Sequence, residues 1–224
     1  MSTDYGVSML KYSFRKYQPL SLRLWHWLNA AVILGLLGTV LLRKTLLSWR
    51  TNSTLIQEKL KEAGTIITPE LAKDLAVAIR NPLWDWHIYL GFALGALLLG
   101  RIAIALFIEK KCPGVHAFKS AMGLKDLPPH EKAEALHYTL VKIGYAFFYL
   151  STALMVVTGF LLNFKTAIGL SKDLVGVTKE IHELMMWFFI FFGVGHVLGV
   201  VIAENSKAPG LISDMIHGGD PKIK

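Results

Sequence analysis

The chain has 224 residues, of which 53% are hydrophobic and only 18% are charged, and its formal net charge is +8. This composition excludes a disordered chain, and the single cysteine, Cys112, excludes an intramolecular disulfide, a cysteine-held iron–sulfur cluster and covalent haem attachment through CxxCH. The basic residues lie in the links between apolar runs, a pattern that favours contact with a membrane surface over nucleic-acid binding.

Four apolar runs predict transmembrane helices, because a bilayer core about 30 Å thick needs roughly 20 apolar helical residues. The link between the first two runs contains two stretches of helical composition, with Pro69 near the start of the second. We therefore expect an all-α membrane protein, a four-transmembrane-helix bundle with short extramembrane helices in the 43–82 link. It would form a single domain over residues 1–224, with membrane helices at about 22–43, 82–108, 139–164 and 181–203.

The N-terminal segment does not fit a cleavable signal peptide, since the first run is too long and is closed by Arg43 and Lys44. Residues 1–20 are polar and aromatic, which is typical of an interfacial tail. Four spans place both termini on one side of the membrane. A small excess of lysine and arginine on that side favours cytoplasmic termini.

Four of the eight histidines lie inside or at the ends of the predicted spans, where ionisable residues are costly and usually functional. His182 and His196 are fourteen residues apart, which on a helix is about 21 Å and about 40° short of four full turns, so they share a face. Helix direction then places His26 at the depth of His196, and His87 at the depth of His182. Each depth thus holds two histidines from two different helices.

A pair of imidazoles is what a six-coordinate haem iron needs at its axial positions, and without CxxCH the haem would be b-type. Zinc is a competing interpretation, although it usually takes three or four close ligands. Four structural histidines that only hydrogen-bond within the bundle are the other alternative. We interpret the pattern as two bis-histidine haem b sites, with the ligand pairs His26/His196 and His87/His182.

Small residues near these histidines are candidates for haem contact, because glycine lets a backbone approach a flat ligand; they are Gly91, Gly95, Gly193 and Gly199. Ordinary small-residue helix packing explains them equally well. Arg101 lies fourteen residues after His87, at the depth of the His26/His196 pair, and Arg23 lies just before His26. Either arginine is suited to pair with a haem propionate, with snorkelling to the membrane surface as the alternative.

His137 begins the third predicted helix on the terminal side, near the depth of His26 and His196. It is placed to donate to a propionate or to a quinone carbonyl. The remaining histidines lie outside the spans, where solvation at the interface is the simpler interpretation.

Several motifs resemble one family. The segment Arg23-Leu-Trp-His26-Trp-Leu-Asn29 resembles the R-x-x-H-W opening of bacterial di-haem cytochrome b membrane subunits, and His87-Ile-Tyr-Leu-Gly91 resembles their second-helix motif. The spacing of His182 and His196 is similar to that of the family's fourth helix. His196-x7-Glu204, the Ile212–Gly218 segment and His137-Tyr138 resemble the Ni/Fe-hydrogenase b-type cytochrome, whose core is shared by formate dehydrogenase gamma subunits. The resemblance covers residues 18–219, except for the 43–80 link.

The resemblance implies the same two ligand pairs, a bacterial cytoplasmic membrane location, cytoplasmic termini, and a periplasmic position for His87 and His182. Our hypothesis is electron transfer across the membrane between a periplasmic redox subunit, such as a hydrogenase, and the quinone pool. The partner would dock on the 43–82 link and the 165–180 loop, and quinone contacts would come from His137, Lys142 or Glu204. The catalytic chemistry would then belong to a partner subunit.

Two other functions stay open from the sequence. One is a stand-alone quinone-linked cytochrome b oxidoreductase, which would act on quinone without a partner subunit. The other is a haem-free membrane anchor subunit, which would show no haem absorption and would tolerate changes to its histidines.

Overall fold

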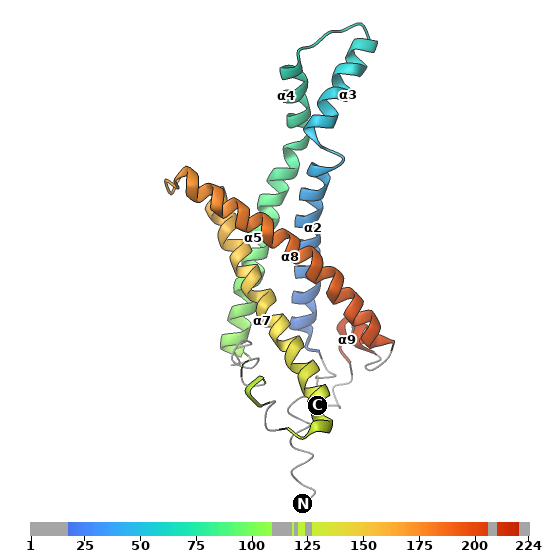
Figure 1. The fold of residues 1–224 in the computed structure, drawn as a ribbon, viewed down its shortest axis with the longest axis vertical. Coiled ribbons are helices and arrows are strands. Elements are labelled where there is room, and N and C mark those ends of the chain that lie inside the picture. The colour runs from blue at the N-terminus through green and yellow to red at the C-terminus, as the bar shows by residue number, and fades with distance from the viewer. Residues whose placement is uncertain (1–17, 109–117, 119–120, 124–126, 206–209, 220–224) are drawn as a thin grey trace, which may run out of the picture. The chain divides into compact units, whose positions relative to one another are not determined.

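The computed structural model describes residues 18–108, 118, 121–123, 127–205 and 210–219, and within these ranges every regular element is helical (Figure 1). The predicted interfacial tail lies almost wholly outside the described residues, as does Cys112. The elements are α2 (Leu20–Lys44), α3 (Trp49–Glu62), α4 (Pro69–Arg80), α5 (Pro82–Ala103), the π-helix η1 (Ile104–Ile108), α7 (Pro129–Asn163), α8 (Lys172–Glu204) and α9 (Leu211–His217).

Local sequence explains where several helices begin. Proline is the first residue of α4, α5 and α7, a position where its missing N–H costs nothing and its fixed φ suits the helix. Thr68 and Ser171 cap α4 and α8, since their hydroxyls accept from the N–H groups of Leu71 and Leu174.

The four predicted membrane-spanning helices are confirmed as helices that are long and apolar enough to cross a bilayer. They lie within Leu20–Lys44, Pro69–Phe107, Glu131–Asn163 and Lys172–Glu204. The short helices α3 and α4 occupy the predicted 43–82 link. The chain is therefore an all-α, multi-pass membrane protein.

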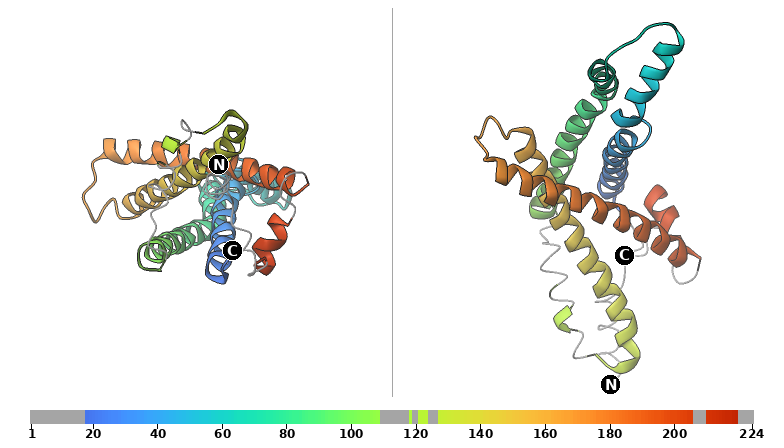
Figure 2. Two further views of the ribbon diagram at one scale, coloured as in Figure 1. Left: turned by 90° about the horizontal axis from the view of Figure 1, so that it is seen from below. Right: turned by 45° about the horizontal axis from the view of Figure 1, so that its top comes forward.

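The chain divides into two compact units, residues 28–95 and residues 1–27 with 96–224. In the first, α3 and α4 form a hairpin that buries Ala72 and Ala76, and Figure 2 shows the two helices side by side. The parts of α2 and α5 that belong to this unit, residues 28–44 and 82–95, run antiparallel. Three successive contacts define their register: Gly35 with Leu90, Thr39 with His87, and Arg43 with Trp84.

In the second unit, α7 packs against α8, and α8 against α9. Phenylalanine rings fill the α7–α8 contact: Phe148 stacks on Phe192 with ring centroids 4.9 Å apart, and Phe147 meets Phe188 edge to face at 5.1 Å. Further along the same two helices Thr158 contacts His182, so the pair is antiparallel. These contacts position the histidines of α8.

Candidate functional site

The structure brings His26 of α2 and His196 of α8 together. Their ring centroids lie 6.2 Å apart, and the ring planes are inclined at 53°. His196 also stacks on Phe192, one turn earlier in α8, at 6.0 Å and 3°. His26 meets the neighbouring Trp27 ring edge to face at 5.1 Å. Two imidazoles that are 170 residues apart in sequence thus lie close together within one unit.

Nδ1 of His26 is buried and has no hydrogen-bond partner among the described residues. A buried nitrogen of this kind needs an explanation, because most buried polar atoms in proteins are paired. Nδ1 of His26 is therefore not committed to a hydrogen-bond partner among the described residues.

Arg101 contacts the indole of Trp25, the residue before His26. The Trp25 indole donates to the Leu97 carbonyl at 2.9 Å and lies 5.9 Å from the Tyr149 ring. Nε of Arg101 donates to the Tyr149 hydroxyl at 3.3 Å, and its guanidinium carbon lies 6.0 Å from the centre of the Trp25 ring. Arg101 therefore places a cation beside Trp25, the residue that precedes His26.

Arg23 has a different set of partners. Its guanidinium donates to the Ile216 carbonyl and lies 3.2 Å from where a Cβ would stand on Gly218, whose φ is +104°. The Trp27 indole donates to the Met215 carbonyl at 3.1 Å. The start of α2 is thus hydrogen-bonded to α9, and Arg23 links these two helices whether or not it also pairs with a propionate.

His87 belongs to the first unit and is held by α2. Its Nδ1 lies 2.9 Å from the Thr39 hydroxyl, and its ring stacks on Trp84 at 5.1 Å with only 6° between the planes. The Thr39 hydroxyl also donates to the Leu36 carbonyl of its own helix, at 2.7 Å.

His182 belongs to the second unit and has an equivalent neighbour. Its Nδ1 lies 2.9 Å from the Thr158 hydroxyl, which donates to the Leu154 carbonyl at 2.8 Å. A Cβ on Gly159 would stand 3.3 Å from Cε1 of His182, so this glycine lets the imidazole lie against α7.

The predicted glycines do not serve close helix packing within their own units. A Cβ built on Gly91, Gly193 or Gly199 would meet no heavy atom of the described residues of its unit within 4 Å. The interpretation of these three as ordinary helix-packing glycines therefore has no support within either unit. Gly95 ends the first unit, on α5.

The three residues predicted near a quinone lie on two helices. His137 is exposed on α7, and the Lys142 ammonium lies over the Tyr138 and Tyr145 rings at 5.1 and 5.7 Å. The carboxylate of Glu204, at the end of α8, accepts from the N–H groups of Gly210 and Ile212 at 2.9 and 3.0 Å. Glu204 thereby anchors α9.

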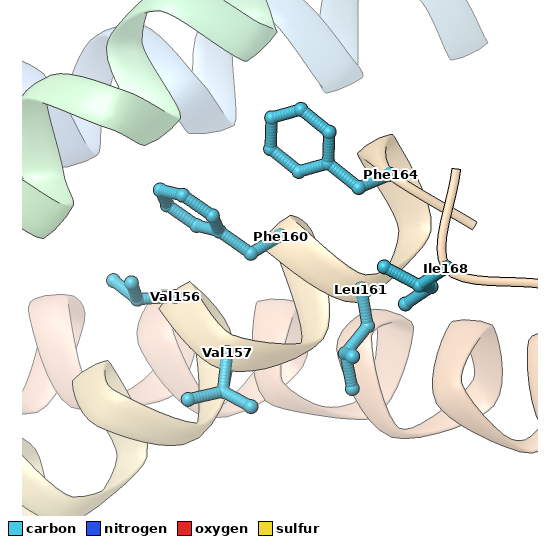
Figure 3. Close-up of a pocket in the computed structure, with 6 residues that line it drawn as sticks. All are labelled: Val156, Val157, Phe160, Leu161, Phe164 and Ile168. Atoms are coloured by element: carbon cyan, nitrogen blue, oxygen red, sulfur yellow. The ribbon is translucent and has the colours of Figure 1, made fainter. Parts of the chain in front are cut away.

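An apolar hollow lies at the C-terminal end of α7 and the turn that follows it (Figure 3). Phe160 and Phe164 project from one side of the helix, and Val157 and Leu161 from the other. The hollow begins within one turn of Thr158 and Gly159, so an apolar surface adjoins the place where His182 is held.

Comparison with known protein families identifies the family of the chain. The family model described as prokaryotic cytochrome b561 matches residues 17–218. The chain belongs to the prokaryotic cytochrome b561 family. No curated protein and no solved structure matches the chain.

Membership confirms the predicted resemblance to the Ni/Fe-hydrogenase b-type cytochrome superfamily. A prokaryotic cytochrome b561 binds b-type haem and transfers electrons in a membrane, and the four apolar helices agree with this. It is a multi-pass bacterial membrane protein.

Sequence reasoning missed three residues of this cytochrome b561, namely Thr39, Thr158 and Gly159. A signal was present for the threonines, since each is a polar residue inside a long apolar run, where a polar side chain needs a partner. Gly159 had no distinguishing signal, because many glycines occur in these runs.

Proposed function

We propose that the chain carries electrons across the membrane through two b-type haems, between a periplasmic redox subunit and the quinone pool. His26 and His196 would be the axial ligands of the haem nearer the cytoplasm. His87 and His182 would be those of the haem nearer the periplasm. The termini would be cytoplasmic.

The separation of His26 and His196 is the observation that carries the proposal. A metal–imidazole bond is about 2 Å long, and each ring centre lies about 1 Å behind its nitrogen, so two axial imidazoles on one iron stand about 6 Å apart. The observed 6.2 Å fits this requirement. Within either unit, no three described His, Cys, Asp or Glu side chains gather to hold a metal ion, whereas haem iron asks the protein for only two ligands.

A bound haem supplies the one-electron chemistry, and this chain's residues hold it and set its surroundings. Arg101 would offset the charge of a propionate beside His26, while its stack on Trp25 and its bond to Tyr149 fix its position. Three glycines, beside which a Cβ would meet no heavy atom of the described residues of their own unit within 4 Å, would leave room for the flat ring: Gly91, Gly193 and Gly199.

The quinone would bind on the cytoplasmic side, near α7. His137 is exposed and Lys142 presents a cation held over two tyrosine rings, so both are placed to donate to a carbonyl oxygen. Glu204 suits this role less well, because its carboxylate holds the N–H groups of Gly210 and Ile212. The periplasmic subunit would dock on the α3–α4 hairpin and on the loop before α8.

The test is haem content by pyridine haemochrome and a reduced-minus-oxidised spectrum on the detergent-purified chain. We expect two haems per chain, and one after either His196→Ala or His87→Ala. His217→Ala, which lies outside the spans in α9, is the matched control and should keep both.

Absence of haem from the wild-type chain would overturn the electron-transfer proposal and favour a membrane anchor. Two haems retained after His196→Ala would show that the ligand assignment is wrong. Addition of a quinol to the same sample should reduce the haems, and a failure to do so would remove the quinone pool from the proposal.

A further inference from the structure

We propose that Thr39 and Thr158 are positioning residues, each of which fixes the protonation and the orientation of one histidine within its own unit, His87 and His182 respectively. The inference rests on the proposed function, which assigns both histidines as axial haem ligands. It adds two residues, on two other helices, that would act on haem iron through its ligands.

The direction of the hydrogen bond between Thr39 and His87 follows from the number of protons and lone pairs on the hydroxyl. A hydroxyl has one proton and two acceptor lone pairs. Its oxygen lies 2.7 Å from the Leu36 carbonyl, which can only accept, and 2.9 Å from Nδ1 of His87. The proton therefore goes to the carbonyl, and Nδ1–H of His87 donates to the hydroxyl. Thr39 is only 7% exposed, so no water competes freely for this bond.

Thr158 repeats the arrangement in the other unit. Its oxygen lies 2.8 Å from the Leu154 carbonyl and 2.9 Å from Nδ1 of His182, and the residue is 4% exposed. The same counting makes Nδ1–H of His182 the donor. Two unrelated stretches of sequence thus provide the same arrangement, in which a buried threonine donates to a carbonyl of its own helix and accepts a hydrogen bond from a histidine on another helix.

The consequence concerns the other ring nitrogen. A neutral imidazole with its proton on Nδ1 carries its lone pair on Nε2, the nitrogen that then binds a metal. A hydrogen bond from Nδ1–H also holds the ring plane and makes the ligand more basic. Trp84 also stacks on the His87 ring, and Gly159 also lies beside the His182 ring, so each imidazole has a second neighbour that restricts it.

His26 provides the contrast within the protein. Its buried Nδ1 has no hydrogen-bond partner among the described residues. The two proposed haem sites therefore differ in how their ligands are supported. A more basic axial ligand stabilises the oxidised iron, so loss of either threonine hydroxyl should raise the midpoint potential of the His87/His182 haem only.

The experiment compares Thr39→Val and Thr158→Val in the full-length, haem-loaded chain by redox titration and by low-temperature electron paramagnetic resonance of the ferric haems. We expect both variants to shift the same haem, in potential toward positive values and in its low-spin signal, although they lie on different helices. Haem loss to an excess of apomyoglobin should accelerate by about 10- to 100-fold for that haem, the usual cost of losing such a partner. Thr39→Ser and Thr158→Ser should restore the wild-type values.

Thr152→Val is the matched control. Thr152 is buried on α7 and bonds the Phe148 carbonyl at 2.8 Å in the same way, but no histidine contact is among its described hydrogen bonds. It should leave both haems unchanged, and an equal effect in this control would assign the changes to helix packing and overturn the inference.

The inference and the proposed function fail in different ways. If His87→Ala keeps both haems, the ligand assignment itself is wrong. If His87→Ala loses one haem while neither valine variant changes the potential or the signal of the haem assigned to His87 and His182, the ligand assignment stands and the role of the threonines is refuted. If a valine variant does not assemble, the serine variants are the test. They keep the hydroxyl, so a midpoint potential or spectrum different from wild type would contradict the inference.

Discussion

Gly159 sets how closely the His182 ring can approach α7. A Cβ at this position would stand 3.3 Å from Cε1 of the ring, closer than most real Cβ contacts, so the imidazole must move aside. We expect Gly159→Ala to lower haem occupancy at the His182 site, because the ring would lose its alignment with Thr158. Pyridine haemochrome and redox titration measure the effect.

Gly144→Ala is the control for this prediction, since a Cβ there would meet no heavy atom of the described residues of its unit within 4 Å. It should keep full haem content and stabilise α7 by about 0.5–1 kcal/mol, the usual gain for alanine over glycine in a helix. Equal haem content in the two variants would show that the close approach does not matter.

At the scale of residues, sequence reasoning found the histidines because an ionisable group is conspicuous in an apolar run. It did not find Thr39 or Thr158, because a threonine in a helix can satisfy itself on its own backbone, as both do. Only the structure shows that the same hydroxyls also lie within hydrogen-bond distance of Nδ1 of His87 and His182.

At the scale of elements, a carboxylate at the end of α8 holds the start of α9. Glu204 accepts from the N–H groups at the start of α9, whose first turn follows Gly210 at φ +96°. We expect Glu204→Ala to speed amide hydrogen exchange across Leu211–His217, because these N–H groups lose their acceptor. Exchange in the centre of α8 should not change, and mass spectrometry of the peptides measures both.

Glu183→Ala is the matched control on the same helix, since Glu183 lies more than five turns from α9 along α8 and its ion pair with Lys179, at 3.9 Å, is exposed. It should leave exchange in α9 as in the wild type. Unchanged exchange in the Glu204 variant would show that other contacts suffice to hold α9.

The predicted helices exist, but two of them begin well before their predicted starts. α7 starts at Pro129 and α8 at Lys172, whereas apolar runs alone placed these starts at about 139 and 181. Hydropathy marks only the part of a helix that suits hydrocarbon. The polar first turns continue the same backbone hydrogen bonds, and their beginnings are set by a proline and by the Ser171 cap.

At the scale of the whole molecule, orientation is the open prediction, and Cys112 provides a natural reporter because it is the only cysteine. The proposed topology puts its link on the cytoplasmic side. A membrane-impermeant maleimide should then label Cys112 in inside-out vesicles and not in intact spheroplasts. Gel shift or mass spectrometry measures the labelling.

Thr65→Cys in a Cys112→Ser background is the matched variant, since Thr65 is exposed between α3 and α4. It should show the opposite pattern. Labelling of Thr65→Cys from the cytoplasmic side would contradict cytoplasmic termini. Sequence left this point weakly determined because lysine and arginine are nearly balanced between the two sides.

The bonds between the start of α2 and α9 also decide how this unit would respond to mechanical force. The Gln18 amide donates to the Gly218 carbonyl at 2.9 Å, and Arg23 and Trp27 donate to carbonyls of α9. A tension applied at residues 18 and 218 loads these few bonds one after another, so they open in sequence. These hydrogen bonds between the start of α2 and α9 would break at low force, before any force acts on the contact between α7 and α8.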